Sequence, residues 1–352
     1  MLKKISIKGY KSIRDVDLEL NPINLLIGAN GVGKSNFISF FKLVNNIYEE
    51  KLQEFSLKSG VENLLHYGRK NTTELSGFLK FHTSNSLRFT LKVSEEGNLF
   101  IGEQGSGYQG NENVYNNIKE SNIKESNTFR DVHLRKFLQS CKIYHFHDTS
   151  TSSSMRTPSQ VDDNRVLREN GSNLPSYLYY LQQKHNSDFL RIEKIIASVV
   201  PNFDKFNLSP SSLDETKIKL EWFEKEHGDT YFDATHLSDG SLRFIALTVL
   251  LQQPNLPETI IIDEPELGLH PVSINKLAGL IKSASERGCQ IIISTQSVNL
   301  LNNFSSEDII TVDRENGQST FSRLDGEQIK NWLEDYSLGE LWTKSIIKGQ
   351  PL

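Results

Sequence analysis

The run NLLIGANGVGKSNF, residues 24–37, constrains the fold of this chain more than any other stretch. A short apolar segment leads into the pattern G-x-x-x-x-G-K-S, which extends from Gly28 to Ser35. Glycines in such a loop let backbone N–H groups turn inward around a phosphate, because no side chain obstructs them. The pattern predicts that Lys34 reaches the β- and γ-phosphates of a nucleotide and that the Ser35 hydroxyl binds Mg²⁺. The apolar spacing after Ser35 predicts a helix whose positive N-terminal end faces the same anion.

A second apolar run, IIIDEPELGLHP at residues 260–271, ends in two acids. Three isoleucines in a row predict a strand buried on both faces, and burying unpaired carboxylates is expensive. Taken alone, Asp263 and Glu264 could cap the next helix, face a metal ion, or mark the point where the strand reaches water. With a phosphate loop in the same chain, we expect Asp263 to serve Mg²⁺ through water. We expect Glu264 to polarise the attacking water as a general base.

The composition is that of a globular protein, with 37% hydrophobic and 24% charged residues in a chain of 352. The chain has a net charge of −5, so it lacks the strongly basic character that is typical of nucleic-acid-binding proteins. The two cysteines, Cys141 and Cys289, do not suffice for a disulfide framework or a zinc cluster and suit a reducing compartment. The N-terminus lacks the apolar core of a signal peptide, and no apolar run reaches the ~18 residues that span a membrane. We therefore expect a cytoplasmic protein with no membrane partner.

Alternation of strand-like and helix-like segments at both ends of the chain predicts an α/β fold. We expect a central, mostly parallel sheet and an antiparallel β region near the N-terminus. Residues 102–127 are polar and glycine-rich and contain NIKES twice in tandem, which predicts a solvated loop. The predicted division is a head formed by residues 1–101 and 205–352, with residues 102–204 inserted as a loop and a mainly helical lid.

Local patterns add expectations inside and after the predicted lid. Apolar spacing predicts helices over residues 130–138, 170–185 and 187–200. Two alternating segments further on predict a hairpin whose turn is EHGD, residues 226–229.

A third motif, HLSDGSLRF at residues 236–244, stands about twenty residues before the acidic strand. Ser238 or Asp239 would cap a helix that begins near Ser241. Any capped helix could show LSDG, so the motif is informative only through its position. The predicted final strand, CQIIISTQS, follows the acidic strand by about twenty-five residues.

The order of phosphate loop, LSxG motif, apolar strand ending in DE, and final strand resembles the ABC-type ATPases. Within that class the chain is similar to the RecF/SMC-like heads, and more closely to the bacterial "AAA family" ATPases of the OLD and Septu type. The similarity rests on DEPELGLHP, on TQS in place of a histidine-bearing final motif, and on IKGYKSI, YHFHDTS, NRVLRENGSNL and YSLGELW. It extends over essentially the whole chain and is weakest over residues 102–127.

The resemblance implies a role for each motif residue. ATP and Mg²⁺ would be bound by the phosphate loop and the residue after it, namely Gly28, Asn30, Gly31, Gly33, Lys34, Ser35 and Asn36. Asp263 is the implied metal-binding acid and Glu264 the implied catalytic base. Heads of this family close face to face around two ATP molecules, so a homodimer or a higher oligomer is implied. Ser238 and Gly240 would then contact the γ-phosphate of the ATP bound to the other subunit.

The chain departs from transporter-like relatives at two places. Gln296 replaces the switch histidine; it can hydrogen-bond a phosphate oxygen or water but carries no charge, so we expect hydrolysis to be slow or to need a trigger. The glutamine of the Q-loop is not placed, because VENLLHYG offers only His66. Lys11 and Arg14 follow the first predicted strand, where basic residues of similar heads reach nucleotide, although they could equally be surface charges.

The resemblance is compatible with several functions, and the sequence argues against three of them. A transporter engine would require a membrane partner. A nuclease of the OLD type would carry a TOPRIM domain, whereas the segment after Ser297 shows no clustered metal-binding set. The absence of sustained heptads between Ser35 and Leu237 also excludes the long arms of SMC proteins.

Two readings remain. The first is an ATPase switch in a bacterial anti-phage defence module, which dimerises on ATP and controls a separate effector such as a nuclease or toxin. The second is a RecF-like DNA-repair ATPase that clamps duplex DNA. The acidic balance and the lack of a basic run favour the first reading.

Overall fold

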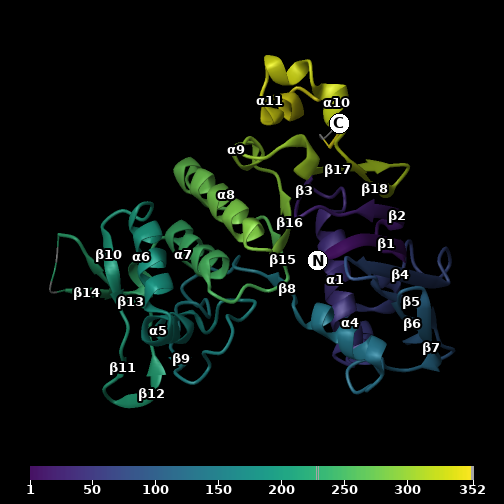
Figure 1. The fold of residues 1–352 in the computed structure, drawn as a ribbon, viewed down its shortest axis with the longest axis horizontal. Coiled ribbons are helices and arrows are strands. Elements are labelled where there is room, and N and C mark those ends of the chain that lie inside the picture. The colour runs from purple at the N-terminus through teal and green to yellow at the C-terminus, as the bar shows by residue number, and fades with distance from the viewer. Residues whose placement is uncertain (227, 229, 350–352) are drawn as a thin grey trace. The chain divides into compact units, whose positions relative to one another are not determined.

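The computed structural model describes residues 1–226, 228 and 230–349 (Figure 1). The chain divides into two compact units. Unit 1 comprises Met1–Ile143, Pro257–Ile261 and Cys289–Leu352, and unit 2 comprises Tyr144–Leu256 and Ile262–Gly288. The boundaries of these units differ from those of the predicted head and lid, because residues 102–143 belong to unit 1 and residues 205–256 to unit 2.

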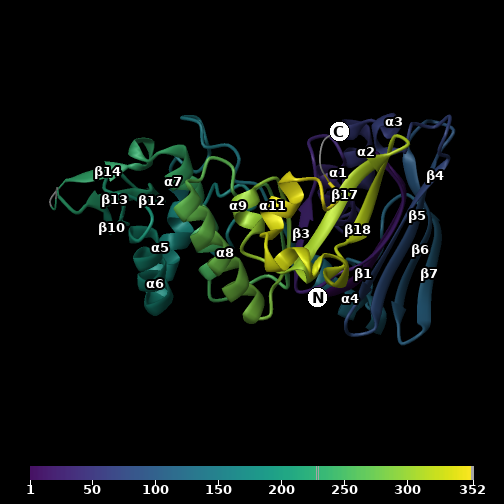
Figure 2. The ribbon, with the colours of Figure 1, turned by 90° about the horizontal axis from the view of Figure 1, so that it is seen from above.

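Unit 1 contains a six-stranded antiparallel sheet in the order β2-β1-β4-β5-β6-β7, whose strands β4 to β7 lie side by side in Figure 2. The strands are β1 (Leu2–Tyr10), β2 (Ile13–Glu19), β4 (Glu74–Phe81), β5 (Asn85–Val93), β6 (Leu99–Tyr108) and β7 (Asn111–Ile118). Buried and more exposed positions alternate along β1, with Ile5 and Ile7 fully buried, as a sheet with one packed face requires. The predicted antiparallel β region is confirmed.

The prediction of a loop over residues 102–127 is wrong for its first part, which forms most of β6 and all of β7. The glycines of β6 do not indicate a flexible segment, because they make room for side chains of β5. A Cβ atom on Gly105 would lie 2.8 Å from Nε of Arg88, and one on Gly107 would lie 2.3 Å from the Ser86 hydroxyl. Glycine within a strand often marks this kind of close approach.

Unit 1 also holds a mixed sheet in the order β18-β17-β3-β16-β15-β8. Its strands are β3 (Ile23–Ile27), β8 (Cys141–Tyr144), β15 (Thr259–Asp263), β16 (Gln290–Thr295), β17 (Ile309–Glu315) and β18 (Gln318–Arg323), and the last residues of β8 and β15 belong to unit 2. Strand β3 is parallel to both β16 and β17, whereas β18 is antiparallel to β17. Every residue of β16 is buried, as in other parallel strands covered on both faces. The α/β fold class is confirmed.

Helix α1 (Lys34–Tyr48) packs its aromatic face on the antiparallel sheet. The ring of Phe40 stacks on Phe89 of β5 at 5.9 Å between centroids. Gly77 of β4 permits this contact, because its Cβ atom would lie within 2.6 Å of both rings. The helix after the phosphate loop is therefore anchored in the core of unit 1. The other helices of this unit are α2 (Leu52–Ser59), α3 (Val61–Leu64), α4 (Phe129–Gln139), α9 (Val298–Leu301), α10 (Gly326–Ile329) and α11 (Leu338–Thr343), with 3₁₀ turns at Ser306–Asp308 and Trp332–Glu334.

Unit 2 is built around α7 (Asp239–Gln252), which lies beside α8 (Pro271–Glu286) in Figures 1 and 2. Every residue of α7 from Leu242 onward is buried, as expected of a helix that is apolar on all sides. The predicted lid helices are confirmed as α5 (Leu174–Lys184) and α6 (Asn186–Ala197).

Two small antiparallel sheets complete unit 2, in the orders β10-β13-β14 and β11-β12-β9. Their strands are β9 (Ser159–Gln160), β10 (Phe203–Asn207), β11 (Pro210–Ser211), β12 (Asp214–Ile218), β13 (Glu221–Glu224) and β14 (Tyr231–Asp233), the last followed by a 3₁₀ turn at Ala234–His236. The predicted hairpin is confirmed in the pairing of β13 with β14, while His227 and Asp229 of its turn lie outside the described residues. Within the part of the chain that the structure describes, no helix has the length and apolar character to cross a membrane.

Candidate nucleotide-binding site

The phosphate loop connects β3 to α1, and close neighbours surround two of its glycines, Gly28 and Gly33. A Cβ atom on Gly28 would lie 2.4 Å from the carbonyl oxygen of Val312 in β17. A Cβ atom on Gly33 would lie 2.1 Å from the Ser319 hydroxyl of β18, and the φ angle of Gly33 is 117°, which side-chain-bearing residues rarely adopt. Strands β17 and β18 therefore leave no space for larger residues at these two positions.

Lys34, the first residue of α1, is 5% exposed and lies against its own loop. Its ammonium donates to the carbonyl oxygens of Gly28 at 2.7 Å and Ala29 at 2.9 Å. Phosphate oxygens can accept from the same ammonium, which is the predicted role of this lysine. Ser35 is exposed in the first turn of the helix. Its hydroxyl is the hard oxygen donor that Mg²⁺ prefers, so the residue fits the predicted metal ligand.

Gln296 follows β16 and meets the phosphate loop. Thr295 pairs with Ile27 in the parallel register of β16 and β3, so the residues after both strands emerge together. The Gln296 side-chain amide donates to Oδ1 of Asn30 at 2.7 Å. The structure thus brings the residue at the switch-histidine position into contact with the loop, while its role in hydrolysis stays a prediction.

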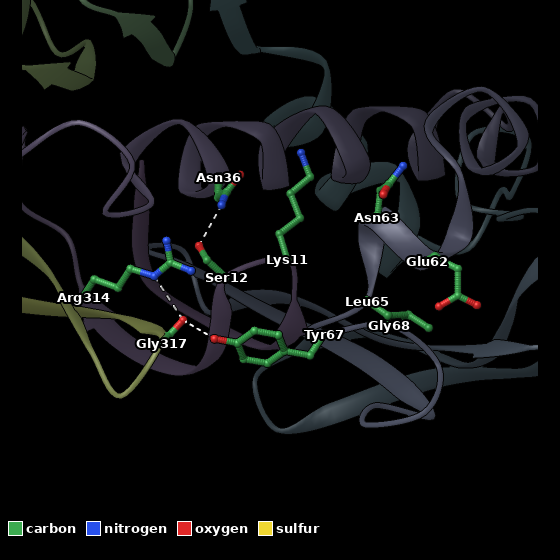
Figure 3. A pocket seen from close by; sticks show the side chains of 10 residues that line it. All are labelled: Lys11, Ser12, Asn36, Glu62, Asn63, Leu65, Tyr67, Gly68, Arg314 and Gly317. Atoms are coloured by element: carbon green, nitrogen blue, oxygen red, sulfur yellow. Dashed lines mark hydrogen bonds between the residues drawn. The ribbon is translucent and has the colours of Figure 1, made fainter.

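A cavity of about 610 Å³ lies beside the first turns of α1 (Figure 3). Segments far apart in the sequence form the walls of this cavity. The residues that line it include Lys11, Ser12, Asn36, Tyr67, Arg314 and Gly317. The Asn36 amide donates to the Ser12 hydroxyl at 2.7 Å, and the Tyr67 hydroxyl donates to the Gly317 carbonyl at 2.6 Å. These bonds join the β1–β2 turn to α1 and the segment before β4 to the β17–β18 hairpin.

Of the two basic residues after β1, only Lys11 lines this cavity. Its ammonium donates to the Ser39 hydroxyl at 3.0 Å, and burial, followed by the charge of Lys42, lowers the pKa of Lys11. Arg14 lines a neighbouring cavity of about 580 Å³ instead. His66 lies with Nδ1 2.7 Å from the Lys11 carbonyl oxygen, so this residue helps to fix the turn that carries Lys11.

Asp263 and Glu264 stand where β15 ends. Residues Ile260–Ile262 are buried, whereas both acids are partly exposed. Glu264 has a φ angle of 41°, a left-handed conformation that costs a residue with a side chain about 1–3 kcal/mol and is common at functional sites. The acids fall in unit 2 and the phosphate loop in unit 1. A metal site shared between Ser35 and Asp263 therefore stays a prediction from the sequence.

The LSDG motif forms the N-terminal turn of α7. The Ser238 hydroxyl accepts from the backbone N–H of Ser241 at 3.1 Å, which confirms the predicted cap. A Cβ atom on Gly240 would lie 2.5 Å from the carbonyl oxygen of Gly268, so only glycine fits beside the turn that follows β15. A cavity of about 480 Å³ adjoins the N-termini of α7 and α8, where anions are favoured. Contact of Ser238 and Gly240 with the γ-phosphate of another subunit remains a prediction.

Sequence reasoning missed the contribution of the C-terminal hairpin to the phosphate loop. The Ser319 hydroxyl of β18 donates to the Val32 carbonyl at 2.5 Å and lies 2.6 Å from the Ser12 hydroxyl, although Ser12 and Ser319 are 307 positions apart. Arg314 and Gly317 of the same hairpin line the cavity of Figure 3. No motif marks these residues, and only the packing of β18 against β17 brings them to the site.

Known proteins are similar in sequence to parts or nearly all of this chain. The Old nuclease of Escherichia phage P2 is 22% identical over 376 residues, which is 96% of this chain and 63% of that protein. The energy-coupling factor transporter ATP-binding protein EcfA of Methanocaldococcus jannaschii is 39% identical over 66 residues, covering 19% of this chain and 23% of that protein. The chain thus spans less than two thirds of the length of each of these relatives.

Solved structures show the same fold at low sequence identity. The crystal structure of the SmcHead bound to the C-winged helix domain of ScpA matches with a TM-score of 0.62 and 17% identity, over 94% of this chain and 99% of that one. Fold, phosphate loop and relatives together define an ABC-type P-loop ATPase of the RecF/SMC-like group. Residues 23–302, well over half of the chain, match the family described as "AAA domain, putative AbiEii toxin, Type IV TA system", and the chain belongs to this family.

Proposed function

We propose that this chain binds and hydrolyses ATP, and that ATP drives two copies to close face to face around two nucleotides. The observation that carries the proposal is the phosphate loop, in which Lys34 lies against the loop carbonyls and Gln296 bonds to Asn30. Membership of an ATPase family supports the same conclusion.

The residues of unit 1 would bind the nucleotide. Backbone N–H groups of the loop surround the phosphates, and the Lys34 ammonium exchanges the carbonyl oxygens of Gly28 and Ala29 for phosphate oxygens. The cavity of Figure 3 would take the nucleoside, because it adjoins α1 and its volume of about 610 Å³ lies within the range of small-ligand sites. Lys11 and Arg314 outnumber the one acid, Glu62, among the charged residues that line this cavity, so its lining is net basic.

Ser35 and Asp263 would hold Mg²⁺, which supplies positive charge against the β- and γ-phosphates when it is bound. Glu264 would take a proton from the attacking water, as a general base at the end of β15. Gln296 would orient that water or a phosphate oxygen without contributing charge, so hydrolysis would be slow or would need a trigger. Ser238 and Gly240 of one copy would donate hydrogen bonds to the γ-phosphate held by the other.

The biological role proposed for this ATPase is a switch in an anti-phage defence module, where the closed dimer controls a separate effector such as a nuclease or toxin. The similarity to the Old nuclease of a phage over almost the whole chain supports a role in conflict between phages and bacteria. The family description, which names a putative toxin and a type IV TA system, supports a place for this chain in such a module.

The rate of ATP hydrolysis as a function of protein concentration, with and without duplex DNA, tests this function. We expect a rate that rises more steeply than linearly with protein and does not respond to DNA, and we expect no hydrolysis by Lys34→Ala. Marked stimulation by DNA would support the RecF-like clamp instead. A strictly linear dependence would contradict the dimerising switch.

A further inference from the structure

A buried arginine outside the known motifs holds the turn that carries LSDG. The side chain of Arg156 is 5% exposed. Its guanidinium donates to the Leu237 carbonyl from both terminal nitrogens, each at 3.1 Å, and also to the Ala234 carbonyl. One of these nitrogens pairs with the Asp239 carboxylate at 2.9 Å, and Nε donates to the Thr149 carbonyl at 3.0 Å. Arg156 therefore bonds to the residue on each side of Ser238.

The segment that presents Arg156 is itself firmly held. The Met155 side chain is fully buried, and it packs so closely on Gly171 that a Cβ atom there would lie 2.8 Å from the sulfur. Asp148 accepts from the backbone and hydroxyl groups of Ser150, and the Ser153 hydroxyl donates to the Asp148 carbonyl at 2.6 Å. Because its segment is ordered by these contacts, the guanidinium loses little further freedom when it binds the turn.

A second arginine, on α7 itself, donates hydrogen bonds back to the segment that precedes Arg156. Arg243 extends from α7 and donates to the carbonyls of Phe146 and His147, each at 2.9 Å. It also donates to the Leu267 carbonyl, in the turn that follows β15. The position of α7 is thus fixed by Arg243 along the helix, whereas the orientation of its first turn depends on Arg156.

We propose that Arg156 is a positioning residue for Ser238. By holding the Leu237 carbonyl and the Asp239 carboxylate, it orients the Ser238 hydroxyl and the first N–H groups of α7 for the γ-phosphate of a second copy. The inference rests on the proposed ATP-driven dimer and assigns Arg156 no contact with nucleotide. Without the guanidinium, the carbonyls of Ala234 and Leu237 lose their charged donor, and the turn is free to rotate.

The test compares Arg156→Ala and Arg156→Lys with Arg168→Ala as a matched control. Arg168 also belongs to unit 2 and pairs with an aspartate, Asp163, but its side chain is 56% exposed and it lies in no assigned site. For each protein, ATP affinity is measured by titration at low protein concentration, and the hydrolysis rate is measured against protein concentration. Melting temperatures and circular dichroism report whether unit 2 stays folded.

We expect Arg156→Ala to lower the maximal concentration-dependent rate about tenfold or more, because several charged hydrogen bonds are lost. ATP affinity should stay within about twofold, since the phosphate loop belongs to unit 1 and shares no hydrogen-bond partner with Arg156 of unit 2. Lysine at position 156 keeps a buried cation but lacks the planar set of donors. The Arg156→Lys protein should therefore stay folded but hydrolyse ATP more slowly at high protein concentration. The control should resemble the wild type. If Arg156 had a purely structural role, Arg156→Lys would lower the melting temperature as well as the rate of ATP hydrolysis.

Combination with Ser238→Ala gives the sharpest readout. If Arg156 acts through Ser238, Arg156→Lys should cause little further loss in a Ser238→Ala background, because the two changes remove the same interaction. A wild-type rate in Arg156→Lys, or full additivity with Ser238→Ala, would overturn the inference while leaving the proposed ATPase intact. A wild-type protein whose rate is linear in concentration would overturn both.

Discussion

The phosphate loop and the LSDG turn are both helix N-termini that are predicted to face ATP phosphates, but they are held in different ways. The loop owes its shape to its own glycines and to two strands that touch it, at Val312 and Ser319. The LSDG turn is held from outside by Arg156 and Arg243, whose side chains bind backbone carbonyls. The phosphate loop is recognisable from contiguous residues although distant strands pack on it, whereas no local pattern marks the arginines that hold the LSDG turn.

This difference suggests a division of labour. Changes to the loop should damage nucleotide binding by a single copy of the chain. Changes to the LSDG turn should leave that binding intact and damage only the steps that need two copies.

Replacement of Glu264 by glutamine should separate hydrolysis from binding most strongly. Loss of a general base lowers rates by about 100- to 10,000-fold, while the amide keeps the shape of the side chain. ATP affinity should change little. Phosphate release under single-turnover conditions measures the effect, with Glu286→Gln at the exposed end of α8 as the control. Glu264→Gln hydrolysing ATP as fast as the wild type would remove this residue from the mechanism.

Replacement of Lys34 by alanine should weaken ATP binding about 100-fold, because two charge-assisted hydrogen bonds of about 1.5 kcal/mol each are lost. Titration with a fluorescent ATP analogue measures the affinity. Lys42→Ala is the matched control, since it removes an exposed lysine from the same helix. Equal affinities of the two variants would mean that the loop does not bind phosphate through Lys34.

Two glycine substitutions compare the regions directly. Gly28→Ala and Gly240→Ala each place a methyl group about as close to a carbonyl oxygen, at 2.4 Å from Val312 and 2.5 Å from Gly268. Overpacking of this kind costs about 1–3 kcal/mol at either site. Gly28→Ala should lose ATP affinity at low protein concentration, whereas Gly240→Ala should keep it and lose the concentration-dependent rate. The same defect in both variants would break the proposed division.

Replacement of Gln296 by alanine should have the smallest effect, a loss of about three- to tenfold in the hydrolysis rate, which corresponds to one neutral hydrogen bond. Asn30→Ala removes the partner of the same bond at 2.7 Å. The double variant should therefore be no slower than either single variant, as coupled neighbours require. Additive losses would show that Gln296 acts without Asn30.

The sequence predicted those parts of the fold and site that depend on neighbouring residues. The loop from Gly28 to Ser35, the cap at Ser238 and the buried strand before Asp263 follow from glycine, capping and apolar patterns. In each case the signal lay within a few residues of the feature.

The remaining features depend on packing between distant segments, which leave no local pattern. The part of β6 from residue 102 onward was predicted as a loop because its glycines are typical of loops, although they accommodate Arg88 and other side chains of β5. Tyr67 and Arg314 reach the cavity of Figure 3 only because the β17–β18 hairpin lies against the segment before β4. Arg156 stands in a serine-rich stretch that resembles an ordinary loop, and only the folded structure shows that its side chain is buried and bonded to the Leu237 carbonyl.

Sedimentation velocity of Glu264→Gln with and without ATP and Mg²⁺ would detect the proposed ATP-driven dimer, because a copy that cannot hydrolyse ATP should accumulate in the closed form. We expect a monomer without nucleotide and a dimer with it, and we expect that adding Arg156→Ala restores the monomer. A Glu264→Gln protein that binds ATP tightly and sediments as a monomer at every concentration would contradict the ATP-driven switch.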